Sequence, residues 1–435
     1  MKRYKLLNNV LGWVVFVIAA VTYILTLEST ASFWDCGEFI ASGYKLEVGH
    51  PPGNPIFMLT ARFFANFASS PSEVAYMVNL MSGLLSAATI LLLFWTITRL
   101  AQKIVLRDGE TEETMSLGQM IAILGCGLVG ALAYAWSDTF WFSAVEGEVY
   151  AYSSFCTALV FWLILKWESV ADLPHANRYI ILIAYIIGVS IAVHLLNLLC
   201  IPAIVLVYYY RKYKNTDLKG SLIALLVSFV LIVLLLYGLV PGFVEVASWV
   251  ELLFVNVFHL PFNSGVVFYF FLIVGVIAWA IYETYAQRSD KLIKISFLIS
   301  IVLVGIPFIG DGYIIGIVLT AALAYYLFTR KKLAVVAMNT ILLSLFVIFI
   351  GYSSYALIVI RSTANTPMDQ NSPEDIFSLG GYLNREQYGD RPLFYGQTFP
   401  AEIARDANGT AISTKGKAIW KKKLKTSEDE ADRYI

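Results

Sequence analysis

Long apolar runs recur through the first 360 residues of this chain, and they constrain its fold more than any other feature. A helix that crosses the hydrocarbon core of a bilayer needs about 20 predominantly apolar residues. Hydrophobic residues make up 58% of the chain and charged residues only 14%, which is typical of an integral membrane protein. Continuous spans are expected at residues 10–27, 74–98, 117–136, 149–167, 221–240, 266–285, 295–309, 312–328 and 333–360.

One further apolar stretch, residues 179–210, is too long for a single crossing. His194, Asn197 and Pro202 interrupt it. We therefore expect two short helices that cross and return, giving an all-α membrane protein with about 11 transmembrane helices. The first run follows MKRYKLLNNV and ends without a clear cleavage signal, so an uncleaved first span is expected instead of a signal peptide.

The basic residues between the spans predict the orientation, because Lys and Arg favour short cytoplasmic loops. When the spans alternate, every basic cluster of the membrane part falls on the side of the N-terminus. The N-terminus is therefore expected in the cytoplasm. The opposite face lies in the periplasm of a bacterium, whose inner membrane is the expected location, or in the lumen of a eukaryote. That face is expected to hold the loops 28–73, 138–148 and 242–265 and the polar tail.

The chain is expected to have two parts, a transmembrane domain over residues 1–360 and a short extracytoplasmic segment over 361–435, with one helix around 373–384. The net charge of zero disfavours nucleic acid as a partner. The four cysteines lack Cys-x-x-Cys spacing, and neither a metal site nor another cofactor is expected. Phosphate-loop, nucleophile-elbow and zinc-protease motifs are also missing, so an activated donor dissolved in the membrane would suit an enzyme without a nucleotide site.

The stretch FWDCGEFIASGYKLEVGHPPGNP places several ionisable groups beside the first span. Asp35 and Glu38 lie three residues apart, so a helix starting after Phe33 would put both carboxylates on one face. Partial burial next to the membrane would raise the pKa of at least one of them, as suits a general base. A simpler interpretation is a helix cap at Asp35 and a solvated Glu38. The neighbouring aromatic residue and His-Pro-Pro turn favour a functional role.

Two further groups in this loop are candidates for binding a substrate. HPPGNP is a rigid turn that holds His50 near the membrane surface, although an exposed histidine in a plain loop is the simpler alternative. Arg62 lies in the apolar segment 56–67, where its charge must reach lipid headgroups or an anionic ligand.

The second predicted outer loop, WSDTFWFSAVEGEVYAY, combines acids with aromatic residues. Glu146 and Glu148 precede a span, where carboxylates favour the positive helix N-terminus. Together with Tyr150 they also suit a carbohydrate, because aromatic faces stack on sugar rings and carboxylates bind hydroxyl groups. A substrate role is therefore predicted for them.

The remaining candidates are polar groups inside or just after spans. His194 lies in the interrupted stretch, where such residues line a cavity or simply bond a neighbouring helix. Arg361 and Asn365 follow the last span, and the guanidinium could bind a lipid phosphate or merely anchor the helix at the interface.

Four segments, WDCGEF, GHPPGNP, VEGEVYAYS and RSTANTPMDQNSPED, together resemble a known family. An acidic pair just outside the first span, followed by a Pro-Pro turn, resembles the type-C (GT-C) membrane glycosyltransferases, including protein O-mannosyltransferases and aminoarabinose transferases. The segments look most like a bacterial family, once called a domain of unknown function, whose vertebrate relatives are secretory-pathway O-mannosyltransferases. The resemblance extends over about residues 8–400.

The resemblance implies an inverting glycosyltransferase that moves a sugar, mannose being expected, from a polyprenyl-phosphate donor to a hydroxyl acceptor such as Ser or Thr of an exported protein. It implies that Asp35 is the general base, that Glu38 assists it, and that His50 and Arg361 lie near the donor phosphate. Many bacterial relatives continue into a longer soluble region, so additional membrane or periplasmic subunits are expected partners, beside membrane lipids.

Two other function classes fit a chain of this kind. A transporter or flippase for lipid-linked sugars would carry ionisable residues within several spans, and this sequence has few there. A non-enzymatic membrane subunit of an envelope or export complex would be consistent with the short tail. The concentration of charge in the outer loops favours chemistry at the membrane surface.

Overall fold

The computed structural model describes the chain except residues 1, 108, 310–312, 331, 333, 390–395, 397, 413–417 and 428–429. Helices dominate the described part, as expected for an all-α membrane protein. A two-residue antiparallel strand pair, β1 (Lys422–Lys423) and β2 (Arg433–Tyr434), lies near the C-terminus. The predicted fold class is confirmed.

A helix corresponds to every span that the sequence predicts. These helices are α1 (Lys2–Leu25), α4 (Val74–Val105), α5 (Leu117–Ala135), α7 (Val149–Val170), α8 (Arg178–Ile191), α9 (Ile201–Lys212), α10 (Leu218–Val233), α12 (Ser264–Ala286), α13 (Asp290–Leu303), α14 (Tyr313–Thr329) and α15 (Val335–Tyr352). Among the described residues, eight helical segments are long and apolar enough to cross a membrane. The larger predicted number of crossings includes shorter helices such as α8 and α14, and it stays a prediction.

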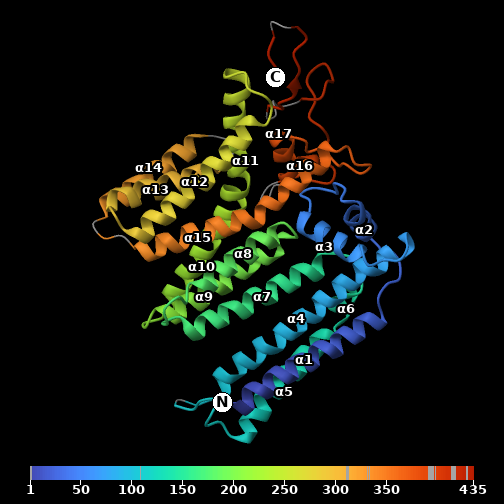
Figure 1. The fold of residues 1–435 in the computed structure, drawn as a ribbon, viewed down its shortest axis with the longest axis vertical. Helices are drawn as coiled ribbons and strands as arrows, with labels where there is room; N and C mark the ends of the chain where they lie inside the picture. The colour runs from blue at the N-terminus through green and yellow to red at the C-terminus, as the bar shows by residue number, and fades with distance from the viewer. Residues whose placement is uncertain are drawn as a thin grey trace.

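Shorter helices connect the spans or follow them. They are α2 (Cys36–Lys45), α3 (Pro55–Ala65), α6 (Asp138–Ala144), α11 (Val240–Leu252), α16 (Ala356–Thr363) and α17 (Ile376–Leu383), with short 3-10 turns at Pro71–Glu73, Leu195–Cys200, Ser353–Tyr355 and Glu386–Tyr388. Helix α17 is the helix predicted for the polar tail. In Figure 1, α2, α3, α16 and α17 gather at one end of the long helices, away from the N-terminus.

The predicted break between residues 179 and 210 is confirmed. Helix α8 ends at Ile191, a 3-10 turn follows, and Pro202 lies in the first turn of α9, where its missing N–H costs nothing. Backbone carbonyls that lose their helical hydrogen bonds at the break accept hydrogen bonds from other segments. The Tyr355 hydroxyl donates to the Ile191 carbonyl (3.2 Å), and the Ile56 N–H donates to the Ala192 carbonyl (3.2 Å). The break therefore lies against α3 and the segment before α16.

The expectation of a loop over residues 242–265 is wrong for most of that range. Helix α10 continues through a π-helical segment, Leu234–Leu239, into α11 and a second π-helical segment, Leu253–Val257. Pro241 lies in the first turn of α11 directly after the π-helical segment, where a missing donor is tolerated. The apolar helix thus extends well past its predicted end (Figure 1).

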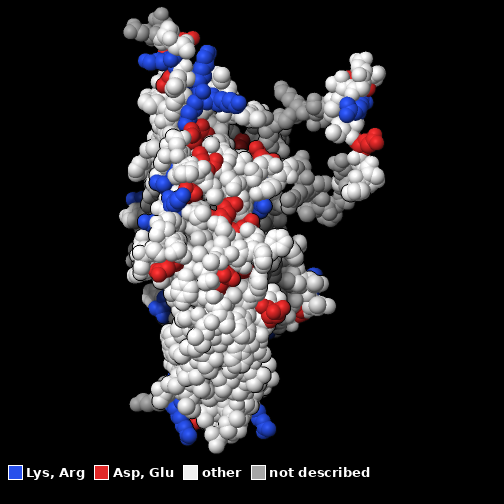
Figure 2. Space-filling model, turned by 90° about the vertical axis from the view of Figure 1, so that its right-hand side faces the viewer, with Lys and Arg blue, Asp and Glu red and all other residues white. Residues whose placement is uncertain are grey.

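The surface agrees with a protein that spans a membrane. Figure 2 shows a broad area without Lys, Arg, Asp or Glu in the lower part of that view, with basic residues at its lower edge and acidic residues above it. Many large apolar side chains of α14 are exposed, among them Ile314, Val318 and Tyr325. Exposed apolar faces of this size are typical of contact with lipid.

Helices α8 and α15 pack against each other through two glycines. A Cβ built at Gly188 would lie 2.6 Å from the Ile348 carbonyl oxygen, and one built at Gly351 would lie 2.4 Å from the Gly188 carbonyl carbon. Both contacts are with backbone atoms, which cannot move aside as a flexible side chain would. Small residues allow such close approach of helices in membranes.

We expect Gly188→Val to destabilise the protein by about 1–3 kcal/mol, because the added side chain must push α15 away. Gly125→Val on α5 is the matched control, since a Cβ there meets nothing within 4 Å. Thermal denaturation of both variants in the same detergent measures the difference. Equal midpoints would show that the Gly188 contact does not hold the two helices together.

Candidate active site

Helix α2 begins where the sequence analysis placed its helix. Asp35 is the N-cap residue, its carbonyl accepts the Phe39 N–H (2.9 Å), and its exposed side chain makes no capping hydrogen bond. Glu38 lies in the first turn and is half-buried. The Asp35 carboxylate is therefore not used as a helix cap and remains available to a ligand.

Glu38 and His50 form a close pair across the loop that follows α2. The Glu38 Oε1 atom lies 2.8 Å from His50 Nδ1 and accepts the His50 backbone N–H at 2.6 Å, while Oε2 accepts from Gln370 Nε2 at 3.3 Å. Burial acts to raise the pKa of Glu38, but the bonds from His50 and Gln370 outweigh it and lower that pKa. The bond to Glu38 raises the pKa of His50. Both shifts favour a charged pair.

The turn after His50 is held from the far end of the chain. The Gly53 N–H donates to the His50 carbonyl (2.9 Å), and Gly53 has a positive φ of 76°. The buried Tyr382 hydroxyl of α17 donates to the Gly49 carbonyl (2.7 Å). A Cβ at Gly53 would lie 2.7 Å from that hydroxyl. The rigid turn predicted from HPPGNP is therefore also clamped by the segment after the last span.

Glu146 and Glu148 are both buried, with 5% and 6% of their surface exposed. Burial raises the pKa of Glu148 to about 7, with the charges of Asp35 and Glu146 adding to the increase and the Val149 N–H and His50 opposing it. Burial also raises the pKa of Glu146, against the influence of Ser32 and Cys36. The interactions of Glu148 with Asp35 and Glu146 bring the acids of these two loops into one acidic cluster.

Tyr150 and His194 lie together on the side of α7. Their rings meet edge to face with centroids 5.4 Å apart, and Tyr150 is exposed. The His194 Nδ1 atom accepts the Leu196 N–H (3.1 Å) and caps the 3-10 turn of the broken hairpin. His194 thus has the structural role that the sequence analysis left open, and its ring also faces the exposed Tyr150.

Arg385 was not predicted as a site residue. It directly follows α17, its side chain is exposed, and its charge acts on both His50 and His194. Nothing in the local sequence distinguishes this arginine, because its approach to the site depends on how α17 packs. Tyr382 was missed for the same reason, and Gln370 was missed because its place depends on the backbone bonds of residues 368 and 370 to Val48.

Arg62 and Arg361 meet at the other end of α2. Arg62 Nη1 donates to the Tyr44 carbonyl (2.5 Å), and Arg361 Nε donates to the Leu46 carbonyl (2.6 Å). With Lys45 they line an open cavity of about 440 Å³. The distance along the helix axis from Glu38 to Leu46 is about 12 Å. The structure therefore brings the two arginines together but not into contact with His50.

Asn365 is the candidate that the structure connects least with the others. It is exposed, has a positive φ of 50°, and forms the turn after α16 through its backbone N–H to the Ser362 carbonyl (2.9 Å). Across the part of the chain that the structure describes, no group of His, Cys, Asp and Glu side chains has the arrangement of a metal site.

Comparisons with known proteins agree with the motifs. A family model described as the protein O-mannosyl-transferase TMEM260 N-terminal domain matches residues 35–217. The mouse protein O-mannosyl-transferase TMEM260 is 27% identical over 209 residues, which cover 48% of this chain and 27% of the mouse protein. The corresponding protein of Dictyostelium discoideum is 23% identical over 189 residues, 42% of this chain and 20% of that protein. No solved structure matches.

The matched segment extends over less of the chain than the motifs suggested, 35–217 instead of about 8–400. It begins at Asp35 and contains every candidate residue up to His194, whereas Arg361 and Asn365 lie beyond it. The match covers only about a quarter of the length of the curated relatives. Within these bounds the predicted resemblance is confirmed: residues 35–217 of this multi-pass membrane protein are similar to the N-terminal domain of protein O-mannosyl-transferases.

Proposed function

We propose that this protein is a membrane glycosyltransferase that moves mannose from a polyprenyl-phosphate donor to a hydroxyl group, the acceptor being Ser or Thr of an exported protein. The observation that carries the proposal is the uncapped, exposed carboxylate of Asp35 beside the buried acids Glu146 and Glu148. The similarity of this same segment to O-mannosyl-transferases supports the assignment.

In the proposed reaction, Asp35 removes the proton of the acceptor hydroxyl as its oxygen attacks the anomeric carbon of the sugar. The bond between that carbon and the phosphate oxygen breaks, and polyprenyl phosphate leaves with the electron pair. Attack from the face opposite the phosphate inverts the anomeric configuration. The exposed position of Asp35 suits a base that must reach a protein acceptor.

Glu38 acts in this proposal as a positioning residue. It holds His50 through two bonds and is itself held by Gln370. The charged His50 ring and Arg385 would stabilise the phosphate as negative charge develops on it. Tyr150, exposed beside His194, offers an aromatic face for the sugar.

Arg62 and Arg361 are proposed to bind an anionic lipid group at a second place, because the single phosphate of the donor is assigned to His50 and Arg385. Each guanidinium carries five N–H donors, so binding the carbonyls at the end of α2 leaves further donors for an anionic lipid group. Their cavity therefore suits a lipid phosphate, while the bonds to α2 hold that helix against α3 and α16.

The test of the function is transfer by the purified protein in nanodiscs. The expected result is transfer of mannose from polyprenyl-phosphate mannose to a Ser- or Thr-containing exported acceptor. Matched reactions with a nucleotide-linked mannose are expected to give no product, since the donor is proposed to be lipid-linked. Failure with a panel of lipid-linked sugars, by protein that is folded, would favour the non-enzymatic subunit instead.

Arg385→Gln is expected to raise the KM for the lipid-linked donor about tenfold, because one charge-assisted bond to phosphate is lost. Lys214→Gln removes an exposed cation outside both proposed binding places and serves as the matched control. An unchanged KM in Arg385→Gln would remove Arg385 from the donor site.

The orientation is proposed to place the acidic cluster on the extracytoplasmic face and the basic helix ends on the cytoplasmic face. Cys36 cannot report on this because it is fully buried, and Lys331 lies outside the described residues. Cysteines introduced at the exposed positions Ser69 and Lys214 serve as reporters instead. The change Cys126→Ser removes an exposed native cysteine that would also react. In intact cells an impermeant maleimide should label Ser69→Cys only. Labelling of Lys214→Cys before permeabilisation would reverse the orientation.

A further inference from the structure

A cavity of about 470 Å³ lies at the opposite ends of the spans from the candidate active site. The first turns of α1 and the last turns of α4 and α7 enclose it. All three helices are candidate membrane spans, so the cavity lies where a span leaves the hydrocarbon core. It shares no residue with the acidic cluster and does not depend on the proposed function.

Two tryptophans form an aromatic wall of this cavity. The rings of Trp95 and Trp162 are tilted with centroids 5.8 Å apart, and Trp95 Nε1 donates to the Asn8 carbonyl (3.4 Å). Tryptophan at the end of a span is typical of the interface between hydrocarbon and headgroups. The wall therefore places the cavity at headgroup depth.

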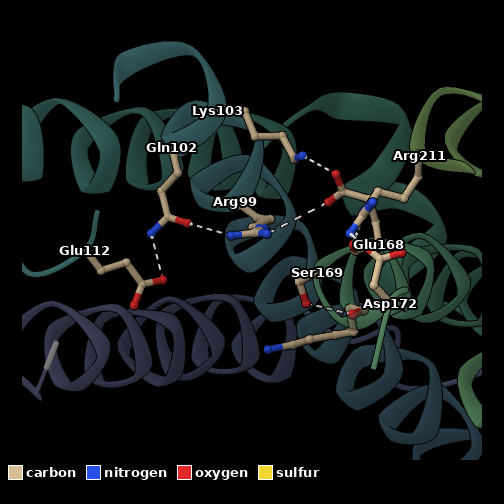
Figure 3. Close-up of polar contacts among 9 residues, drawn as sticks. Arg99, Gln102, Lys103, Glu112, Glu168, Ser169, Asp172 and Arg211 are labelled. Carbon is tan, nitrogen blue, oxygen red and sulfur yellow. Dashed lines mark hydrogen bonds and ion pairs between the residues drawn. The ribbon is translucent and has the colours of Figure 1, made fainter. Parts of the chain in front are cut away.

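Cations outnumber carboxylates around the cavity. Lys5, Arg99 and Lys166 line it, against the single carboxylate of Glu112. The structure holds Arg99 in place from both sides, with Gln102 Oε1 at 3.3 Å and Glu168 Oε2 at 3.8 Å (Figure 3). Lys103 also pairs with Glu168, so that acid is already neutralised outside the cavity.

Lys166 is the cation best suited to an added anion. Its ammonium lies 4.9 Å from the centre of the Trp162 ring, and no carboxylate pairs with it among the residues that the structure describes. Lys5 lies 3.9 Å from Glu112, a long and exposed contact. Neither ammonium is saturated, so both can donate to a phosphate.

Asn8 supplies an acceptor in the same cavity. Its Oδ1 atom is buried and has no hydrogen-bond partner within the described chain. A buried oxygen without a partner is costly, and a hydroxyl donor from a ligand would remove that cost. A phosphate with an adjoining hydroxyl thus matches both the cations and the amide oxygen.

We propose that this cavity binds the headgroup of an anionic glycerophospholipid that carries free hydroxyls, the chemistry of phosphatidylglycerol. The phosphate lies between Lys166, Arg99 and Lys5, and a headgroup hydroxyl donates to Asn8 Oδ1. A choline headgroup fits poorly, because its positive charge would meet the cations and it has no hydroxyl to donate. Membrane lipid is present at this depth wherever the protein is inserted.

The test uses the full chain in phosphatidylcholine nanodiscs that contain a minor fraction of either dibrominated phosphatidylglycerol or dibrominated phosphatidylcholine. Bromine quenches the fluorescence of nearby tryptophan. The quenching that belongs to this cavity is the part that disappears in the double variant Trp95→Phe/Trp162→Phe. We expect greater quenching by the phosphatidylglycerol. Equal quenching by the two lipids would overturn the proposal.

Two variants and a control separate the bound headgroup from general charge attraction. Lys166→Gln and Asn8→Leu should each weaken the apparent affinity for phosphatidylglycerol, Lys166→Gln by about tenfold. Lys214→Gln removes an exposed cation that does not line the cavity and should change nothing. Equal losses of affinity for phosphatidylglycerol in Lys166→Gln and Lys214→Gln would show that surface charge alone attracts the lipid, and would overturn the proposed site. If soluble glycerol phosphate binds equally tightly in detergent, the site binds a soluble ligand, and the proposal of a lipid headgroup is overturned.

Discussion

Asp35→Asn is expected to reduce the rate of sugar transfer by about 100- to 10,000-fold, the range that a general base supplies. The amide keeps the size of the side chain but cannot take up the acceptor proton. The fold should be unaffected, because the Asp35 side chain is exposed and caps nothing. The measurement is the turnover number with polyprenyl-phosphate mannose at saturating acceptor, for the wild type and the variant at equal purity.

Three further amide variants make this result interpretable. Glu38→Gln should lose less activity, since it acts through His50, and Glu47→Gln should lose little. Asp138→Asn changes an exposed acid at the start of α6 and is the matched control for Asp35. Wild-type turnover in Asp35→Asn would exclude Asp35 as the base and make Glu148 the next candidate, because its pKa of about 7 lies near the working pH.

Glu148→Gln is expected to stabilise the protein at pH 8 relative to the wild type and to have little such effect at pH 4.5. The pKa of Glu148 is raised from 4.5 to about 7 in the folded state, so between these values the folded protein retains a proton that the unfolded chain has released. Stability contributed by this group therefore falls as the pH rises through this window. The difference reaches up to about 3 kcal/mol above pH 7, and less to the extent that water reaches the carboxylate.

Thermal denaturation in detergent across this pH range measures the effect. Glutamine can still accept the Val149 N–H, so the cap of α7 is preserved. Asp35→Asn should lower the pKa of Glu148 and shift the same curve toward lower pH, because the Asp35 charge is one cause of the increase. A pH dependence identical in the wild type and Glu148→Gln would show that Glu148 is not a buried acid.

Hydrophobic run length predicted the helices well, because each span satisfies its own backbone hydrogen bonds and needs no distant partner. The same local reasoning identified the break within residues 179–210 and the helix expected after Phe33. It failed over residues 242–265, where the helix continues through a π-helical segment past its predicted end. The extra residue in the turn leaves no clear mark in an apolar sequence.

The candidate site was predicted less completely, because part of it depends on packing between distant segments. Glu38 and His50 lie in one loop, and their pairing follows from a rigid turn close in sequence. Arg385 and Tyr382 reach the site only because α17 folds back over that loop. The resemblance implied that Arg361 lies near the donor phosphate with His50, whereas the structure shows its guanidinium bonded to the far end of α2.

The clamp of α17 on the first loop has a consequence for biosynthesis. Gln370 bonds Glu38 across 332 residues, and Tyr382 bonds Gly49 across 333. While the chain is being synthesised, the loop around His50 enters its compartment long before either partner has left the ribosome. The arrangement of Glu38 and His50 is therefore completed only after the last span has been inserted. A partly inserted chain carries Asp35 already, but it lacks the contacts that hold the rest of the site, so the proposed transferase activity should appear late and all at once during membrane insertion.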